Sequence, residues 1–299
     1  MTRSRLAVPL MLLALWSADP LAAQLQAAPR RADPDLPQLL DLGGSPLAVV
    51  RYTPGSLERA WRVQRRLVTF SAEVTTLLND RTPFLAYLLT REEWEAAGFQ
   101  RPFGMPELTA GGALALPAVA DAESVRLWRG LLAGALPAPS SHQMMASPQE
   151  VGALTAAEVL GWVEIGRLVV ERNPAAVDTP WLSEVLAHLV ARVPFIRNHQ
   201  DDLAAIDSVF VGMVMAGGGD GARPLAAWRP DLPIAEQLWF QGQFGRGAAA
   251  LIADRGFFPT RRLLEGTLRK RKPLAAAELI AKGPAFSGWL QVGFAPFAQ

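Results

Sequence analysis

Hydrophobic positions in the first half of the chain follow two periods, one typical of strands and one typical of helices. Three short apolar runs bounded by Pro or Gly predict buried strands, at 47–53, 84–89 and 111–118. Apolar residues three or four positions apart predict helices between and after them, at 56–79, 91–99 and 122–136. In the longest of these helices we expect the buried face to consist of Leu57, Trp61, Val68, Val74 and Leu78.

From residue 149 onward the helical period continues without strands. We expect helices at 150–172, 180–193, 199–215, 233–254, 259–270 and 273–281. Strands mixed with helices, followed by helices alone, predict an α+β fold with a small mixed β-sheet in the N-terminal part and an all-helical C-terminal half. The corresponding units are a sheet subdomain over 46–148 and a helical subdomain over 149–299.

The N-terminal region reads as a targeting segment followed by a linker. Residues 1–23 combine two arginines with an apolar stretch over 6–16 and small residues at the end, as in a secretory signal peptide. The apolar stretch is too short for a stable helix across a bilayer, which favours a cleaved signal peptide. The alternative is a segment that stays uncleaved as an N-terminal anchor. Residues 24–45 are rich in Pro and Ala without sustained periodicity, which predicts a linker. We therefore expect a periplasmic or secreted protein with no transmembrane segment after signal cleavage.

Composition narrows the chemistry further. The 299 residues carry a formal net charge of +1, which gives no long-range field for nucleic acid, so we expect no nucleic-acid partner. Cysteine is absent, which excludes disulfides, thiolate nucleophiles and cysteine metal ligands. No G-x-S-x-G elbow is present, and we expect the SGW at 287–289 to be only a turn.

The segment GWVEIGRLVV (161–170) places two charges inside an otherwise apolar helix. In zinc peptidases of the HExxH type, two histidines four apart bind the metal and the glutamate beside the first polarises the water. Here Glu164 stands in the glutamate slot, and Val163 and Arg167 stand in the two histidine slots. After a short loop, WLSEVLA (181–187) begins another predicted helix that carries Glu184.

In this arrangement the chain resembles the gluzincins, the thermolysin-like or peptidase-MA-like clan of zinc metallopeptidases. Their third metal ligand is a glutamate in a second helix with a pattern close to W-L-N-E-G-x-A, and on that match Glu184 occupies the third-ligand position. Ser183 and Val185 depart from the pattern. The preceding strands and long helix, and the helical segment past residue 230, also look like the pieces of that clan in order. The likeness extends over 46–290.

The departures from the gluzincin pattern concern catalysis itself. Neither Val163 nor Arg167 is a zinc ligand, and a cation at residue 167 would repel the metal. Gluzincins also use a downstream Tyr or His to stabilise the oxyanion, whereas Tyr52 and Tyr87 lie in predicted strands and no histidine follows His199. By resemblance the chain is a degenerate gluzincin, a secreted or periplasmic pseudopeptidase with a peptide-binding or structural role and no cofactor.

Loss of the metal would leave a buried carboxylate without a partner. We therefore expect an Arg167–Glu184 ion pair in place of the zinc clamp, with Glu164 as a second partner of the guanidinium. The alternative is a solvated helix face on which Glu164 and Arg167 form an ordinary pair three residues apart.

Three functional alternatives stay open. An extended peptide or envelope protein would pair with the strand GGALALPA, for which the family suggests an edge position at Ala113, Leu114, Ala115 and Leu116. A metal-dependent hydrolase with altered ligands would use zinc held by Glu164, Glu184 and His188, with His199 as another candidate. A purely structural envelope protein would have a closed cleft.

Two further segments have more than one interpretation. The glycines of AGGGDG (216–221) and QGQFGRG (241–247) lack the strand-glycine-helix context of a phosphate loop, so we expect turns or helix packing there. The basic run RKRK (269–272) fits the C-terminus of a helix, where cations complement the helix dipole, or a contact with an envelope surface.

Overall fold

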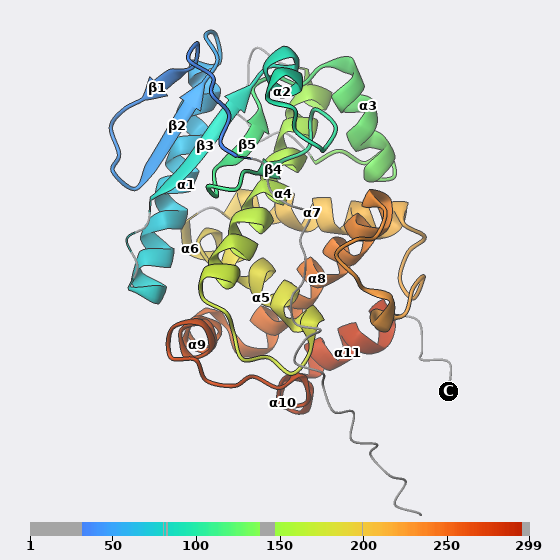
Figure 1. Cartoon of the computed structure of the whole chain (residues 1–299). Coiled ribbons are helices and arrows are strands. Elements are labelled where there is room, and N and C mark those ends of the chain that lie inside the picture. The colour runs from blue at the N-terminus through green and yellow to red at the C-terminus, as the bar shows by residue number, and fades with distance from the viewer. Residues whose placement is uncertain (1–31, 80, 82, 138–146, 199, 295–299) are drawn as a thin grey trace, which may run out of the picture.

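The computed structural model of the chain describes residues 32–79, 81, 83–137, 147–198 and 200–294. Over these residues the fold is α+β, as predicted, with one small mixed sheet in the N-terminal part and helices that dominate the C-terminal half (Figure 1). The expected signal segment 1–23 and the first part of the expected linker lie outside the described residues, as do His142 and His199.

The sheet has the strand order β1-β2-β3-β5-β4. Its strands are β1 (Leu40–Leu42), β2 (Ala48–Tyr52), β3 (Phe84–Leu89), β4 (Glu107–Leu108) and β5 (Leu114–Pro117). The three central strands run parallel, and the two edge strands, β1 and β4, pair with their neighbours antiparallel. Helix α1 (Leu57–Leu78) connects β2 to β3, as a parallel connection requires.

One strand lies inside the segment 24–45 that was expected to be a linker. Leu40 pairs with Tyr52 and Leu42 with Val50, so β1 extends the sheet on the β2 side. Three residues are too few to display a period of two, and therefore no pattern indicated this strand. The folded part begins before residue 46.

The expected edge position of Ala113, Leu114, Ala115 and Leu116 is wrong. Strand β5 lies between β3 and β4, and Ala115 and Leu114 pair with the two residues of β4. All four side chains are buried, because Leu114 and Leu116 pack against the helices of one sheet face and the alanines against the other face. The two residues of β4, Glu107 and Leu108, lie in none of the predicted elements, and they occupy the edge position instead.

Helices α1 and α4 (Pro148–Arg172) cover one face of the sheet. The other face carries α2 (Arg91–Ala97), whose Trp94 packs with Phe99 and Phe103, and the partly buried leucines of the segment before β1. The expected buried face of α1 is partly wrong. Leu57 and Trp61 are 46% and 51% exposed, and the helix turns Ala60, Val63, Leu67 and Phe70 to the core instead.

The C-terminal half packs helix on helix around α8. Its elements are α5 (Pro180–Arg192), α6 (Phe195–Asn198), α7 (Gln200–Ala216), α8 (Ile234–Arg255), α9 (Phe257–Leu264), α10 (Ala276–Lys282) and α11 (Pro284–Gly293), with a 3-10 turn at Leu225–Ala227 and a π-helical turn, η3, at Glu265–Arg269. Helix α3 (Ala122–Leu131) is shorter than predicted. Residues 287–289 are part of α11 and do not form the expected turn.

The two halves share one hydrophobic core. Buried residues from β2, α1, α4 and the helices up to α11 form a single cluster, in which α4 contacts both the sheet and the other helices. Gly161 marks the contact of α4 with the sheet, since a Cβ there would lie 3.1 Å from Leu114 and Leu116. Within the described residues, none of the helices combines the length and the apolar character needed to cross a bilayer.

Candidate functional site

Helix α4 carries the first part of the motif, and its sequence explains its length and depth. Ser147 and Glu150 form a capping box at the N-terminus, and Pro148 occupies the first turn. The 25-residue helix then runs through the core with nearly all its faces covered. Two of its buried residues are carboxylates, Glu158 and Glu164, so each needs a partner of opposite charge.

The expected ion pair is present. Arg167 Nε lies 2.9 Å from Glu184 Oε2, and its Nη1 lies 2.7 Å from Glu164 Oε1. The side chains of Arg167, Glu164 and Glu184 are only 19%, 11% and 14% exposed. A solvated helix face, the alternative interpretation of these charges, is therefore wrong.

The two helices meet because α4 has a glycine at the contact. A Cβ built at Gly166 would lie 2.2 Å from the carbonyl oxygen of Ala187, so α5 approaches the backbone of α4 directly. Glu184 lies one turn before Ala187 on α5, and the close approach brings its carboxylate within reach of Arg167.

A second arginine, Arg101, reaches the same cluster from the sheet subdomain. Its Nη1 lies 2.8 Å from Glu164 Oε1. The loop after α2 holds it there, since Trp94 Nε1 donates a 2.9 Å hydrogen bond to the Arg101 carbonyl and the Arg101 amide donates to Glu107. Sequence reasoning missed Arg101, because nothing local links this loop to a helix more than sixty residues later in the chain.

Charge balance governs the protonation of the cluster. Burial alone would raise the pKa of Glu164, but Arg101 and Arg167 outweigh it and lower that pKa to about 2. Burial likewise opposes the charge of Arg167, whereas Glu164 and Glu184 raise its pKa above the ordinary value. Glu164 and Arg167 therefore face each other in their charged forms. We call Arg101, Glu164, Arg167 and Glu184 the Arg167 cluster.

Hydrogen bonds extend the Arg167 cluster toward α8. Gln241 Nε2 donates to Glu184 Oε2 over 3.2 Å, which directs the Gln241 carbonyl oxygen toward His188. His188 Nε2 lies 2.8 Å from that oxygen, so this nitrogen carries the proton and donates. Burial is the main cause that lowers the pKa of His188 to about 3, so the buried imidazole is neutral.

The residues present do not fit the metal that the gluzincin pattern implies. Val163 is buried in the hydrophobic core, and Glu164 Oε1 and Glu184 Oε2 are both engaged by arginines. The alternative ligand set of Glu164, Glu184 and His188 is not assembled either, since His188 faces Gln241. Within the described ranges, no three His, Cys, Asp or Glu side chains group closely enough to hold a metal ion.

Glu158, the other buried carboxylate of α4, is also paired with two arginines. Glu158 receives Arg59 Nη1 at 2.6 Å and is also paired with Arg66, which reaches Asp202 on α7 at 2.5 Å. Arg59 Nε donates in addition to the Pro117 carbonyl at the end of β5. This network connects α1, α4 and α7 and involves none of the motif residues. Its position between three packed elements indicates a structural role.

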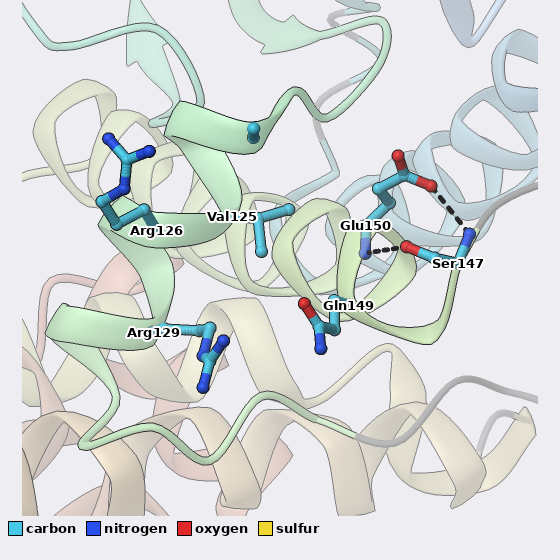
Figure 2. Close-up of a pocket in the computed structure, with 7 residues that line it drawn as sticks. Val125, Arg126, Arg129, Ser147, Gln149 and Glu150 are labelled. Atoms are coloured by element: carbon cyan, nitrogen blue, oxygen red, sulfur yellow. Dashed lines mark hydrogen bonds between the residues drawn. The ribbon is translucent and has the colours of Figure 1, made fainter.

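A surface pocket of about 420 Å³ opens between α3 and the first turn of α4 (Figure 2). Arg126 and Arg129 of α3 line one side, and Gln149 and Glu150 line the other. The capping box engages the Glu150 carboxylate, which accepts from the Ser147 amide, and the Glu150 amide, which donates to Ser147 Oγ, as the dashed lines in Figure 2 show. The pocket contains none of the motif residues, and its arginines are exposed.

The glycine-rich segments serve packing and chain reversal. Gly242 and Gly245 lie within α8, where a Cβ would collide with Phe210 of α7. Gly218, Gly219 and Gly221 have positive φ angles in the turn after α7. Both outcomes agree with the expected turns or helix packing.

Comparison with protein-family models, with curated proteins and with solved structures gives no match to this chain.

Proposed function

We propose that this chain is a non-catalytic, peptidase-MA-like protein of the periplasm or the secreted fraction, in which the Arg167 cluster replaces a zinc centre. One observation carries the proposal: the guanidinium of Arg167 bridges Glu164 and Glu184, the two residues that the gluzincin pattern assigns to the catalytic base and the third ligand. A cation that balances both carboxylates performs the electrostatic task of a metal ion without its Lewis acidity.

The chemistry of the cluster favours a structural or binding role over hydrolysis. A general base must bind a proton near neutral pH, whereas a Glu164 with a pKa of about 2 has almost no affinity for one. The neutral His188 is buried and donates to Gln241, so it does not face a substrate either. Peptide pairing along β5 is not part of the proposal, because β4 already occupies that edge.

Metal analysis of the purified full-length protein tests the non-catalytic part. We expect zinc far below one equivalent and no peptidase activity on a casein substrate, with or without added zinc. One equivalent of tightly bound zinc would contradict the proposal and favour the metallohydrolase alternative.

Rebuilding the metal site tests the gluzincin arrangement itself. Val163→His with Arg167→His restores two histidines four apart opposite Glu184, so the double variant should bind about one equivalent of zinc. Adding Glu184→Gln should remove most of that affinity. Arg167→His alone, which leaves the buried Val163 unchanged, is the milder version if the double variant fails to fold.

A matched control separates this result from adventitious binding. Glu278→His with Lys282→His places two histidines at the same spacing on the exposed face of α10, where no motif glutamate lies opposite. A folded Val163→His, Arg167→His variant that retains no more zinc than this control would refute the proposed ligand arrangement.

A further inference from the structure

The surface at the end of α9 combines exposed cations with an exposed aromatic ring. The segment 257–272 contains six Lys or Arg residues and a single carboxylate, Glu265. Phe258 is 61% exposed, and the cations Arg262, Arg269, Lys270 and Lys272 are exposed as well. We call these five residues the basic surface. It lies at the end of the molecule away from the sheet, where α9 is labelled in Figure 1.

The basic surface is continuous. Phe258 and Arg262 are four residues apart on α9 and share one face of the helix. The π-helical turn η3 continues the helix directly, and the Lys272 amide donates back to the Gly266 carbonyl at 2.9 Å. The Lys272 stem therefore lies beside Gly266, 3.7 Å from where a Cβ would stand. Gly266 is one turn beyond Arg262, so Lys272 extends the same face.

Few of these charges are neutralised within the protein. Glu265 is shared by Lys270 at 3.0 Å and Arg269 at 3.4 Å. Within the described part of the chain, neither Arg262 nor Lys272 has a carboxylate partner. A helix end needs no more than about half a charge to complement its dipole, and four cations with one carboxylate exceed that need.

Residues next to or between those of the basic surface anchor its backbone to the rest of the fold. Phe257 packs against the core and its ring contacts Phe258 edge-on at 5.2 Å between centroids. Arg261 points inward to Glu73 of α1 at 2.5 Å. Arg271, in the left-handed backbone region with φ of 55°, donates to the Pro174 carbonyl in the α4–α5 connection. Binding through Phe258 and the cations therefore needs little further ordering of the backbone.

We propose that the basic surface docks the protein on a membrane that contains anionic lipid. Its cations would face the lipid phosphates, and Phe258 would enter the headgroup region, as in peripheral proteins that combine an apolar anchor with Lys and Arg. The ring favours lipid over a soluble polyanion such as duplex DNA, because binding to the duplex phosphates would use the cations and leave Phe258 in water. This inference is independent of the Arg167 cluster.

Vesicle co-sedimentation of the full-length protein tests the proposal. Pelleting with phosphatidylcholine vesicles that contain about a third phosphatidylglycerol should far exceed pelleting with phosphatidylcholine alone, and should weaken as salt rises. Arg262→Gln with Lys272→Gln should weaken the partition coefficient about 25-fold, since each cation contributes roughly fivefold. Phe258→Ala should weaken it about fivefold.

Matched variants on other surfaces provide the controls. Arg126→Gln with Arg129→Gln removes two exposed cations from α3, and Val292→Ala removes an apolar side chain that is 62% exposed on α11. Both should partition like the parent chain. The N-terminal segment is present in every protein, so its own affinity for lipid cancels in these ratios.

Three results would overturn the proposal. They are equal pelleting with neutral and anionic vesicles, equal losses for the basic-surface and control variants, and DNA binding of similar strength that Phe258→Ala leaves unchanged.

Discussion

At the scale of single residues, the buried acids of α4 explain why an apolar helix retains charge. Glu164 lies between Arg101 and Arg167, and Glu158 lies between Arg59 and Arg66. Removing one partner from such a group leaves a charge in a poorly solvated place, at a cost of about 3 to 5 kcal/mol. Each arginine is therefore required by the carboxylate that it faces.

The protonation of His188 predicts how stability depends on pH. Its pKa is about 3 in the folded chain against 6.5 for a free side chain, so the unfolded chain binds the proton first as pH falls. The stabilisation from His188 is fully present above pH 6.5 and is lost progressively toward pH 3. Glu164, with a pKa of about 2 against 4.5, loses its own contribution in a lower window.

His188→Leu should distinguish the pH range in which His188 loses its contribution to stability from the lower range in which Glu164 does. Urea unfolding of the parent chain should show the free energy of unfolding falling by about 2 to 3 kcal/mol between pH 6.5 and pH 4.5, and the variant should lose most of that slope. Its stability at neutral pH should also fall, because Gln241 loses its donor. The diagnostic quantity is the slope of the free energy of unfolding against pH. A parent and a variant with equal slopes would show that His188 is not held neutral in the fold.

At the scale of elements, the α4–α5 contact depends on the absence of one side chain. Gly166 lets the carbonyl of Ala187 approach the α4 backbone, and the Arg167–Glu184 pair lies beside that contact. Separation of the two helices by even a methyl group would lengthen the ion pair and open the packing around it.

Gly166→Ala should therefore destabilise the fold by about 1 to 3 kcal/mol or more, as overpacked cores do. The matched control is Gly288→Ala in α11, where no atom lies within 4 Å of the added Cβ. That change should be neutral or stabilise the fold by up to about 1 kcal/mol through helix propensity. Chemical unfolding of both variants measures the difference. Equal effects would indicate that α4 and α5 pack less closely than described.

Sequence patterns predicted the elements that are long or strongly periodic. The three parallel strands and helices α1, α4, α5 and α8 appear close to their expected bounds. Strands β1 and β4 were missed because two or three residues carry no period, and the sheet edge was therefore misplaced. Helix α11 was missed because a proline begins it and two glycines lie within it, which are signals of a turn in isolation.

The candidate site was predictable only where a pattern spans neighbouring residues. Glu164 and Arg167 lie on one helix, and the W-L-x-E pattern identified Glu184 on the next. Arg101 and Gln241 come from distant segments, and no local signal connects them to α4. Burial of His188 was equally hidden, because the residues that cover it include Phe210 of α7.

At the scale of the whole molecule, the sheet and the helices depend on each other. Helix α4 packs against β5 on one side and α5 on the other, and Glu158 draws both of its arginines from α1. A boundary near residue 148 separates two kinds of secondary structure, but the hydrophobic core runs through it.

We therefore expect the full-length protein to unfold in one cooperative step. Far-ultraviolet circular dichroism and tryptophan fluorescence should give the same midpoint in urea. A fragment of residues 147–294 should lack a cooperative transition, because α4 would expose the face that contacts Leu114 and Leu116 and leave Glu158 unpaired. Glu158→Gln in the same fragment, which removes the unpaired charge, should still fail to fold. Cooperative unfolding of either fragment would contradict a shared core.

The connection between α4 and α5 is pinned by the chain's C-terminal region. Val177 forms a bridge with Leu274, Asp178 accepts the Ala276 amide, and Arg271 reaches the Pro174 carbonyl. These contacts hold the connection in place. Helices α4 and α5, which carry three of the four residues of the Arg167 cluster, can separate at this end only after residues 271–276 have moved away. Local unfolding therefore has a sequence, in which residues 271–276 separate first. The part of the chain that is synthesised late thus covers a motif that is synthesised much earlier.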